Sequence, residues 1–155
     1  MKILFVCSAN ICRSALAEVV LRKKLQERGI TGVEVESAGV HNYEGEPRDY
    51  IMISYAHKAG YEMGGTSKYI TQEMVESSSL IICMELFHVV ELQRRFVPYA
   101  RWNCIHRFNE ICFDEPTDVM DPSNDSGYIY SETLKHIEIG CGTLAWKIER
   151  GGAIW

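Results

Sequence analysis

The sequence predicts an α/β fold: a single-domain four-stranded parallel sheet with helices on both faces. Apolar runs typical of buried strands alternate with segments of helical periodicity, which is the pattern of strands joined by crossover helices. The chain has 155 residues, of which 46% are hydrophobic, and this is enough for one domain with a sizeable core. We therefore expect residues 1–155 to form one domain.

The first half of the chain contains two predicted strands and two predicted helices. Lys2–Cys7 is apolar enough to be a buried strand, and apolar residues recur at helical spacing over Ala17–Leu25. Residues 33–39 begin with alternating valine and glutamate, which indicates a second strand. A helix is expected over Pro47–Ala59, because proline is favoured in the first helical turn and Gly60 follows the segment.

The second half repeats the alternation. A short helix is expected over Thr71–Glu76, and Leu80–Met84 has the composition of a third buried strand. Apolar residues at helical spacing mark a helix over Leu86–Gln93, and a fourth strand is expected at Trp102–His106. The same spacing predicts a long final helix over Leu134–Ile148.

Composition and charge exclude several classes of protein. A net charge of −5 argues against a general nucleic-acid binder, which would carry a basic face. No apolar run approaches the length of a membrane span, and Ile3–Val6 is too short for a signal-peptide core, so we expect a cytoplasmic protein without a membrane partner. The cysteine spacing fits neither a zinc site nor a disulfide framework, so buried thiols are expected at Cys83, Cys104, Cys112 and Cys141.

The strongest functional signal is the stretch Cys7-Ser8-Ala9-Asn10-Ile11-Cys12-Arg13-Ser14, between the first predicted strand and helix. The first amides of a helix lack partners, so the N–H groups of residues 8–13 can wrap around an anion. Arg13 adds a charged fork that matches two phosphate oxygens, and the same positive field favours the thiolate of Cys7. This equipment can cleave a phosphate ester through a phosphocysteine intermediate.

Three other side chains in the stretch have expected roles. The Ser14 hydroxyl can donate to the thiolate and ease its later departure, and Asn10 tolerates the left-handed backbone that a tight loop can require. Cys12 is either a trap that forms a disulfide with an oxidised Cys7 or a small packing residue. The stretch is not a nucleotide-binding Walker loop, because its glycine and lysine pattern is absent.

The stretch resembles the signature Cys-x-Gly-Asn-x-Cys-Arg-Ser-Pro of the low-molecular-weight protein tyrosine phosphatase family. Ser37-Ala38-Gly39, the strand at residues 80–84 and Asp121-Pro122 extend the likeness over nearly the whole chain. The resemblance implies a flavodoxin-like strand order, no metal and no cofactor. The site residues that it implies are Cys7 as nucleophile, Arg13 as phosphate clamp, Ser8, Ala9, Asn10, Ile11, Cys12 and Ser14 around the phosphate, and Ser37 as a brace for Asn10.

A phenolate, whose conjugate acid has a pKa of about 10, leaves poorly without a proton, so the reaction requires a general acid. The acidic candidates are Asp114, Glu115, Asp118, Asp121 and Asp125. Spacing alone favours a simple turn at Asp121-Pro122. The family's general acid is an Asp directly before Pro, so the resemblance implies that Asp121 protonates the leaving oxygen and then activates water.

Some positions depart from the family pattern. Ala9 replaces a glycine and would be strained if its φ were positive. Aromatic residues that line the family's substrate slot are missing after Asp121-Pro122, whereas Tyr43 matches another slot aromatic that would stack on a phosphotyrosine ring. In the family that the chain resembles, a bulky aliphatic residue at the position of Ile11 accompanies a preference for phosphotyrosine, so the resemblance also favours that substrate. The implied partner is a phosphotyrosine-containing protein, a tyrosine kinase among the candidates, and we expect a monomer or weak dimer.

Three alternatives remain open at this point. The region Thr71–Met84 looks somewhat like the protein arginine phosphatase branch of the family. Arsenate reductases share the first loop, but they need a further redox cysteine pair after the third strand, and no cysteine lies between Cys83 and Cys104. The third alternative is a catalytically inactive module that binds phosphoproteins. It is supported by Ala9 and by the missing aromatic residues after Asp121-Pro122.

Overall fold

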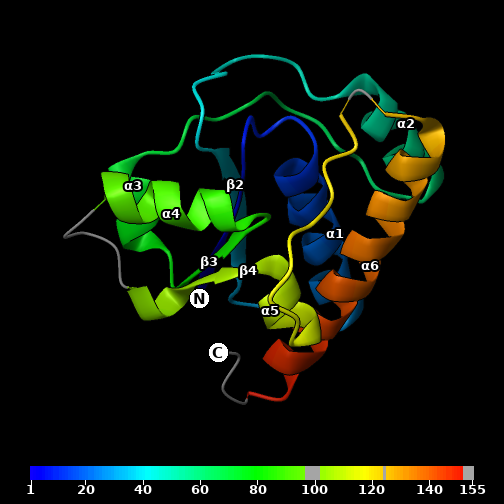
Figure 1. Cartoon of the computed structure of the whole chain (residues 1–155). Coiled ribbons are helices and arrows are strands. Elements are labelled where there is room, and N and C mark those ends of the chain that lie inside the picture. The colour runs from blue at the N-terminus through cyan, green and yellow to red at the C-terminus, as the bar shows by residue number, and fades with distance from the viewer. Residues whose placement is uncertain (97–101, 124, 152–155) are drawn as a thin grey trace.

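Four parallel strands form the centre of the computed structural model, which describes residues 1–96, 102–123 and 125–151 (Figure 1). The strands are β1 (Lys2–Cys7), β2 (Glu34–Gly39), β3 (Leu80–Cys83) and β4 (Ile105–Arg107). Their order is β2-β1-β3-β4, and each neighbouring pair is parallel. The predicted fold class and strand order are confirmed.

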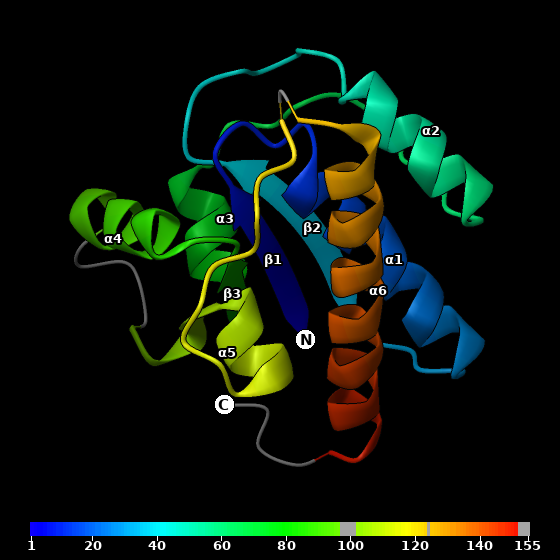
Figure 2. The same ribbon diagram turned by 45° about the vertical axis from the view of Figure 1, so that its right-hand side comes forward.

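Helices cover both faces of the sheet (Figure 2). α1 and α6 pack on one face, and α3 and α4 lie on the other. The helices are α1 (Arg13–Glu27), α2 (Tyr50–Lys58), α3 (Gln72–Ser77), α4 (Leu86–Arg95), α5 (Phe108–Phe113) and α6 (Gly127–Glu149), with a 3₁₀ turn, η1, at Trp102–Cys104. None of the helices in these described residues has the length and apolar character needed to cross a membrane.

The sequence of β1 explains why it is the central strand. Successive side chains of a strand point to opposite faces. Ile3 and Phe5 enter the core beneath α1 and α6, and Leu4 and Val6 enter the core beneath α3 and α4. All four are fully buried, which is why the strand reads as one continuous apolar run instead of an alternating one.

The second helix begins later than the sequence predicted. The expected segment Pro47–Ala59 contains α2 only from Tyr50 onward. Asp49 is the N-cap residue, and its Oδ1 accepts from the N–H groups of Ile51 (2.9 Å) and Met52 (3.0 Å). Pro47 instead pairs with Thr66 in an antiparallel bridge. The capping aspartate, and not the proline, therefore fixes the start of α2.

The region around β4 also differs from expectation. The predicted strand Trp102–His106 is a 3₁₀ turn followed by the three-residue strand Ile105–Arg107. α5, at Phe108–Phe113, was not predicted, because six residues are too few to establish a periodic pattern. Its first turn is fixed by Glu110, whose carboxylate accepts from the backbone N–H (3.0 Å) and guanidinium of Arg107.

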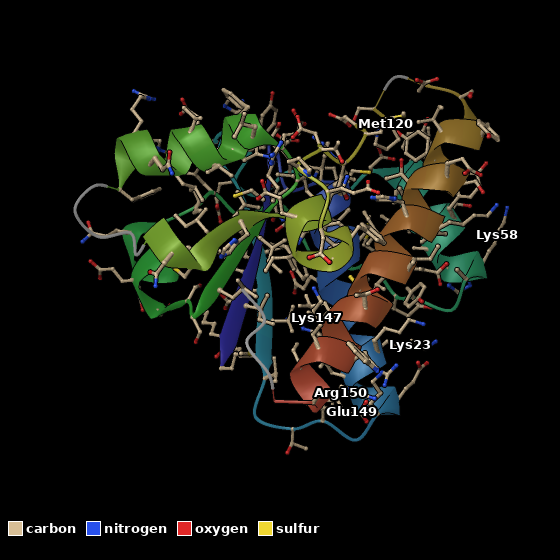
Figure 3. All side chains as sticks on the ribbon, turned by 60° about the horizontal axis from the view of Figure 1, so that its bottom comes forward. Lys23, Lys58, Met120, Lys147, Glu149 and Arg150 are labelled. Atoms are coloured by element: carbon tan, nitrogen blue, oxygen red, sulfur yellow. The ribbon has the colours of Figure 1, made fainter. Side chains whose placement is uncertain are left out.

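α6 begins at Gly127, seven residues before the segment predicted from its apolar spacing. It runs the length of the domain beside α1 and α5 (Figure 3). Lys147 donates to the Ile111 carbonyl of α5 (2.7 Å), and Glu149 pairs with Arg28 at the end of α1 (2.6 Å). These contacts fix the C-terminal half of the helix against both neighbours.

Candidate active site

The Cys7–Ser14 stretch connects β1 to α1 at the carboxyl end of the sheet (Figure 1). β2 and β3 flank β1 on opposite sides, so the loop lies where the direction of strand succession changes. In open parallel sheets, this switch point is where ligands bind. Position in the fold and chemistry of the sequence therefore indicate the same site.

Each backbone carbonyl from Cys7 to Cys12 accepts a hydrogen bond from a group outside the loop. Each pair is given as the accepting carbonyl and then its donor: Cys7 O and Val40 N (3.0 Å), Ser8 O and His41 N (2.9 Å), Ala9 O and Ser67 Oγ (2.6 Å), Asn10 O and Arg48 Nη1, Ile11 O and Asp49 N (2.8 Å), and Cys12 O and Leu16 N (2.9 Å). In a planar trans peptide, the N–H points away from the C=O. We infer that the amides of residues 8–13 face inward and form an anion-binding nest.

Gly39, the last residue of β2, makes this close approach possible. A Cβ at Gly39 would lie 2.8 Å from the Ala9 carbonyl carbon and 2.9 Å from Ser8 O. The Ser37-Ala38-Gly39 stretch therefore ends in a residue without a side chain because the loop packs directly on its backbone.

The Cys7 thiol lies among hydrogen-bonding groups. Its Sγ is 2.9 Å from Ser14 Oγ and accepts from the Asn10 N–H at 3.2 Å. The side chain is nearly inaccessible, with a relative exposure of 4%. Ser14 thus lies where a donor to a Cys7 thiolate is expected.

Asn10 connects the loop to β2. Its φ of 55° is left-handed, and its Nδ2 donates to Ser14 Oγ and Ser37 Oγ, both at 2.8 Å. Ser37 in turn donates to Glu18 of α1. Ala9 is not among the non-glycine residues of the described chain with positive φ, which are Asn10 and Asp114. Replacement of glycine by alanine therefore costs no left-handed strain here.

Arg13 is buried between two carboxylates. Its Nη1 lies 2.6 Å from Glu85 Oε1 and donates to the Val119 carbonyl (2.8 Å), and its Nη2 lies 3.2 Å from Asp121 Oδ2. The guanidinium is 2% exposed, so its charge requires this pairing. Sequence reasoning missed Glu85, although its place directly after the predicted strand Leu80–Met84, at the same edge of the sheet, was a usable signal.

Asp121 lies at one side of the loop, next to Arg13. Its Oδ1 accepts from Ser123 N–H (3.0 Å), and the side chain is half exposed. Asp118 faces another direction, since its Oδ1 accepts from the Leu86 N–H (2.9 Å). Of the acidic candidates in this segment, Asp121 is the one that contacts Arg13.

A buried histidine contacts the loop from α4. His88 Nδ1 accepts from the Glu85 N–H (3.0 Å), so the ring proton resides on Nε2, which donates to Ser8 Oγ at 2.9 Å. Burial and the nearby Arg13 charge lower the pKa of His88 to about 3, and the ring is neutral at pH 7. Sequence reasoning did not identify this contact, because nothing in the spacing connects positions 8 and 88.

Exposed aromatic side chains flank Ser8. The Phe87 and His41 rings lie 5.8 Å apart, and Phe87 is 45% exposed. His41 donates its N–H to the Ser8 carbonyl, and Phe87 precedes His88. Tyr43 is also half exposed. Phe87 is a candidate slot residue that sequence reasoning did not identify.

All six cysteines are buried. Burial raises the pKa of the Cys12 thiol, which is therefore protonated at neutral pH. Cys83, Cys112 and Cys141 are likewise buried protonated thiols, as predicted. In the part of the chain that the structure describes, no group of three or more His, Cys, Asp or Glu side chains could hold a metal ion.

Comparisons with known proteins agree with this geometry. Residues 2–153 match the family model described as low molecular weight phosphotyrosine protein phosphatase. The low molecular weight protein-tyrosine-phosphatase Etp of Escherichia coli is 38% identical over 91 residues, a match that spans 58% of each protein. The protein-arginine-phosphatase of Bacillus subtilis is 31% identical over 153 residues, 97% of this chain and 98% of the relative.

A solved structure of the YwlE arginine phosphatase, a cysteine-to-serine mutant with a phosphorylated active-site serine, superposes with a TM-score of 0.92. It has 25% identity and covers 100% of both chains. The family match spans nearly the whole chain, and the fold agrees with it. The chain therefore belongs to the low molecular weight phosphotyrosine protein phosphatase family.

Proposed function

We propose that this protein is a protein tyrosine phosphatase that hydrolyses phosphotyrosine through a phosphocysteine on Cys7. Arg13 clamps the phosphate, and Asp121 serves as general acid and then general base. The proposed substrate is a phosphotyrosine-containing protein. One observation carries this proposal: the outward carbonyls of Cys7–Cys12 leave a ring of inward amides around a thiol.

Substrate binding requires Arg13 to change partners. Phosphate oxygens are bidentate acceptors for a guanidinium. The dianion would take over the Nη2 hydrogens that now contact Asp121, while Glu85 and Val119 keep Nη1 in place. Release from Arg13 leaves the Asp121 carboxyl free to face the ester oxygen.

The reaction then proceeds in two steps. In the first, the Cys7 thiolate forms a bond to phosphorus, the bond from phosphorus to the tyrosine oxygen breaks, and Asp121 gives that oxygen its proton. In the second, Asp121 takes a proton from water, the hydroxide attacks phosphorus and the phosphorus–sulfur bond breaks. Ser14, 2.9 Å from Sγ, donates to the departing thiolate.

Two side chains support an aromatic substrate. Ile11 is an aliphatic residue that packs partly against the core, beside the proposed phosphate site. Phe87 offers a half-exposed ring on the Ser8 side of the loop. A phosphotyrosine ring could pack between such apolar groups, and aromatic pairs contribute about 0.5–1.5 kcal/mol beyond their buried area.

Phosphoarginine is the second candidate substrate. The similar Bacillus subtilis relative carries the name protein-arginine-phosphatase. Asp121 is a half-exposed carboxylate that could also pair with the guanidinium of a phosphoarginine. Arsenate reduction lacks such support, because Cys83 is fully buried in β3.

Paired peptides would test the proposal. Wild-type protein and Cys7→Ser are each given phosphotyrosine and phosphoarginine peptides of the same sequence, and released phosphate is measured. We expect faster release from phosphotyrosine, and none with Cys7→Ser. Faster release from phosphoarginine would replace the substrate assignment. Equal inactivity of both proteins, with peptide binding retained, would favour a binding module.

A further inference from the structure

Two segments, one after β2 and one after α2, pass next to the phosphate-binding loop at the top of the view in Figure 1. Gly45 N–H donates to Ser67 O (3.0 Å), Ser67 N–H donates to Glu46 O (2.8 Å), and Pro47 forms a bridge with Thr66. We name residues 45–49 and 64–68 the outer ribbon. Of the six outward carbonyls in the loop, three are held by groups of this ribbon, and two of these groups are side chains.

Arg48 is a charged side chain of the outer ribbon that contacts the loop. Its Nη1 donates both to the Asn10 carbonyl and to Asn10 Oδ1, the latter at 2.8 Å. Its Nε donates to Gly64 O at 3.3 Å, which fixes the plane of the guanidinium. Arg48 is 8% exposed and Asn10 is fully buried, so both partners of these bonds lie inside the protein.

The two bonds to Asn10 fix its backbone and its side chain together. The bond to the carbonyl holds that oxygen outward, which aims the Ile11 N–H into the loop. Arg48 Nη1 and the Lys68 N–H (2.9 Å) both donate to Oδ1, which leaves the amide nitrogen pointing to Ser14 and Ser37. Without Arg48, a buried carbonyl in a left-handed residue would lose its partner, and rotation of this peptide would turn an oxygen toward the phosphate.

Arg48 also brings a second positive charge to the rear of the loop. Burial lowers the pKa of the guanidinium, while the Glu18 carboxylate and a Cys7 thiolate act in the opposite direction. An arginine remains charged under such conditions. The cation behind Asn10 and the cation of Arg13 are therefore both close to where negative charge is expected.

We propose that Arg48 is a positioning residue that keeps the Asn10–Ile11 peptide oriented for phosphate binding. This inference rests on the proposed phosphate site. Its consequence is that Arg48, which never needs to touch substrate, sets the affinity of the loop for phosphate.

The test measures phosphate binding separately from turnover. Inorganic phosphate is titrated by calorimetry into wild type, Arg48→Met and Arg48→Lys, with aryl phosphate kinetics in parallel. Because a buried carbonyl loses its partner, we expect Arg48→Met to raise the phosphate Kd at least about tenfold. The lysine of Arg48→Lys can reach one of the two Asn10 oxygens, so the phosphate Kd of this variant should lie between those of wild type and Arg48→Met. Arg94→Met removes an exposed guanidinium that pairs within α4, and should match wild type.

A cavity of about 490 Å³, lined by Arg48, Glu18 and Gly64 among others, allows a second measurement. In Arg48→Ala, added guanidinium ion can enter this cavity and occupy the vacated position. We expect guanidinium at concentrations far below those that unfold the protein to restore phosphate binding, and ammonium ion not to. This difference would not arise if Arg48 only stabilised the fold.

Wild-type phosphate affinity in Arg48→Met would overturn the proposal. If that variant does not fold, wild-type affinity in Arg48→Lys would overturn it, as would equal responses of Arg48→Ala to guanidinium and ammonium. Failure of the proposed function gives a different result: wild type would bind phosphate, with the same dependence on Arg48, but would not hydrolyse aryl phosphates.

Discussion

Arg13 Nη2 lies 3.2 Å from Asp121 Oδ2, so the proposed phosphate clamp and the proposed general acid are partners before any phosphate is present. A charge-assisted bond of this kind is stronger than a neutral one. The half-exposed Asp121 keeps its place through Arg13 and through the Ser123 N–H. Phosphate and Asp121 must therefore compete for Arg13, which links substrate binding to release of the acid.

This competition predicts the behaviour of Asp121→Asn. Loss of the proton donor should lower kcat by about 10²–10⁴-fold for phenyl phosphate, and much less for p-nitrophenyl phosphate, whose leaving group is weakly basic. Inorganic phosphate should bind at least as tightly as to wild type, because a negative charge beside Arg13 is gone. Steady-state kinetics with both esters and phosphate inhibition measure these effects.

Asp118→Asn is the matched control, since its side chain bonds to Leu86 N–H and not to Arg13. It should retain the wild-type ratio of the two ester rates. An equal fall for both esters in Asp121→Asn would show that Asp121 does not donate the proton.

The aromatic pair beside Ser8 predicts a selective effect of Phe87→Ala. If Phe87 packs against the substrate ring, kcat/KM for a phosphotyrosine peptide should fall about 3–10-fold, as expected for one aromatic contact. The kcat/KM for a small alkyl phosphate should not change. Tyr43→Ala tests the slot residue implied by family resemblance in the same assay. Identical losses for ring and alkyl substrates in Phe87→Ala would remove its assignment to the slot.

The central loop could be predicted from the sequence because its residues are neighbours in the chain. Cys7, Asn10 and Arg13 lie within one short loop of the chain. The strand before this loop and the helix after it have clear apolar patterns. The roles of Ser37, as a brace for Asn10, and of Asp121, as general acid, were predicted only from the family resemblance. Glu85, His88 and Arg48 were missed because they reach the loop through tertiary folding, and a single sequence holds no periodic signal for such contacts.

Two glycines in α6 predict opposite changes in stability. A Cβ at Gly140 would lie 2.4 Å from the Phe108 ring, whereas a Cβ at Gly142 would meet nothing within 4 Å. Gly142→Ala should therefore raise the free energy of unfolding by about 1 kcal/mol, the difference in helix propensity. Gly140→Ala should lower it by roughly 1–3 kcal/mol through overpacking. Urea unfolding of both variants measures this, and a gain in stability for Gly140→Ala would contradict the packing of α6 on α5.

The neutral, buried His88 predicts how stability depends on pH. Its pKa is lowered to about 3 in the folded protein, and an unfolded histidine titrates at about 6.5. Between these pH values the unfolded chain binds a proton at His88 that the native protein does not bind. The contribution of His88 to the free energy of unfolding is therefore fully present above pH 6.5 and is lost as the pH falls toward 3. The slope approaches about 1.4 kcal/mol per pH unit. From pH 7 to pH 5, wild type should lose roughly 2 kcal/mol more than His88→Gln, which cannot take up that proton.

Urea unfolding at the two pH values measures the difference, and His57→Gln, at an exposed histidine, should follow wild type. Parallel losses in wild type and His88→Gln would mean that the native protein tolerates a charge at His88, and that Ser8 is not held by a neutral ring.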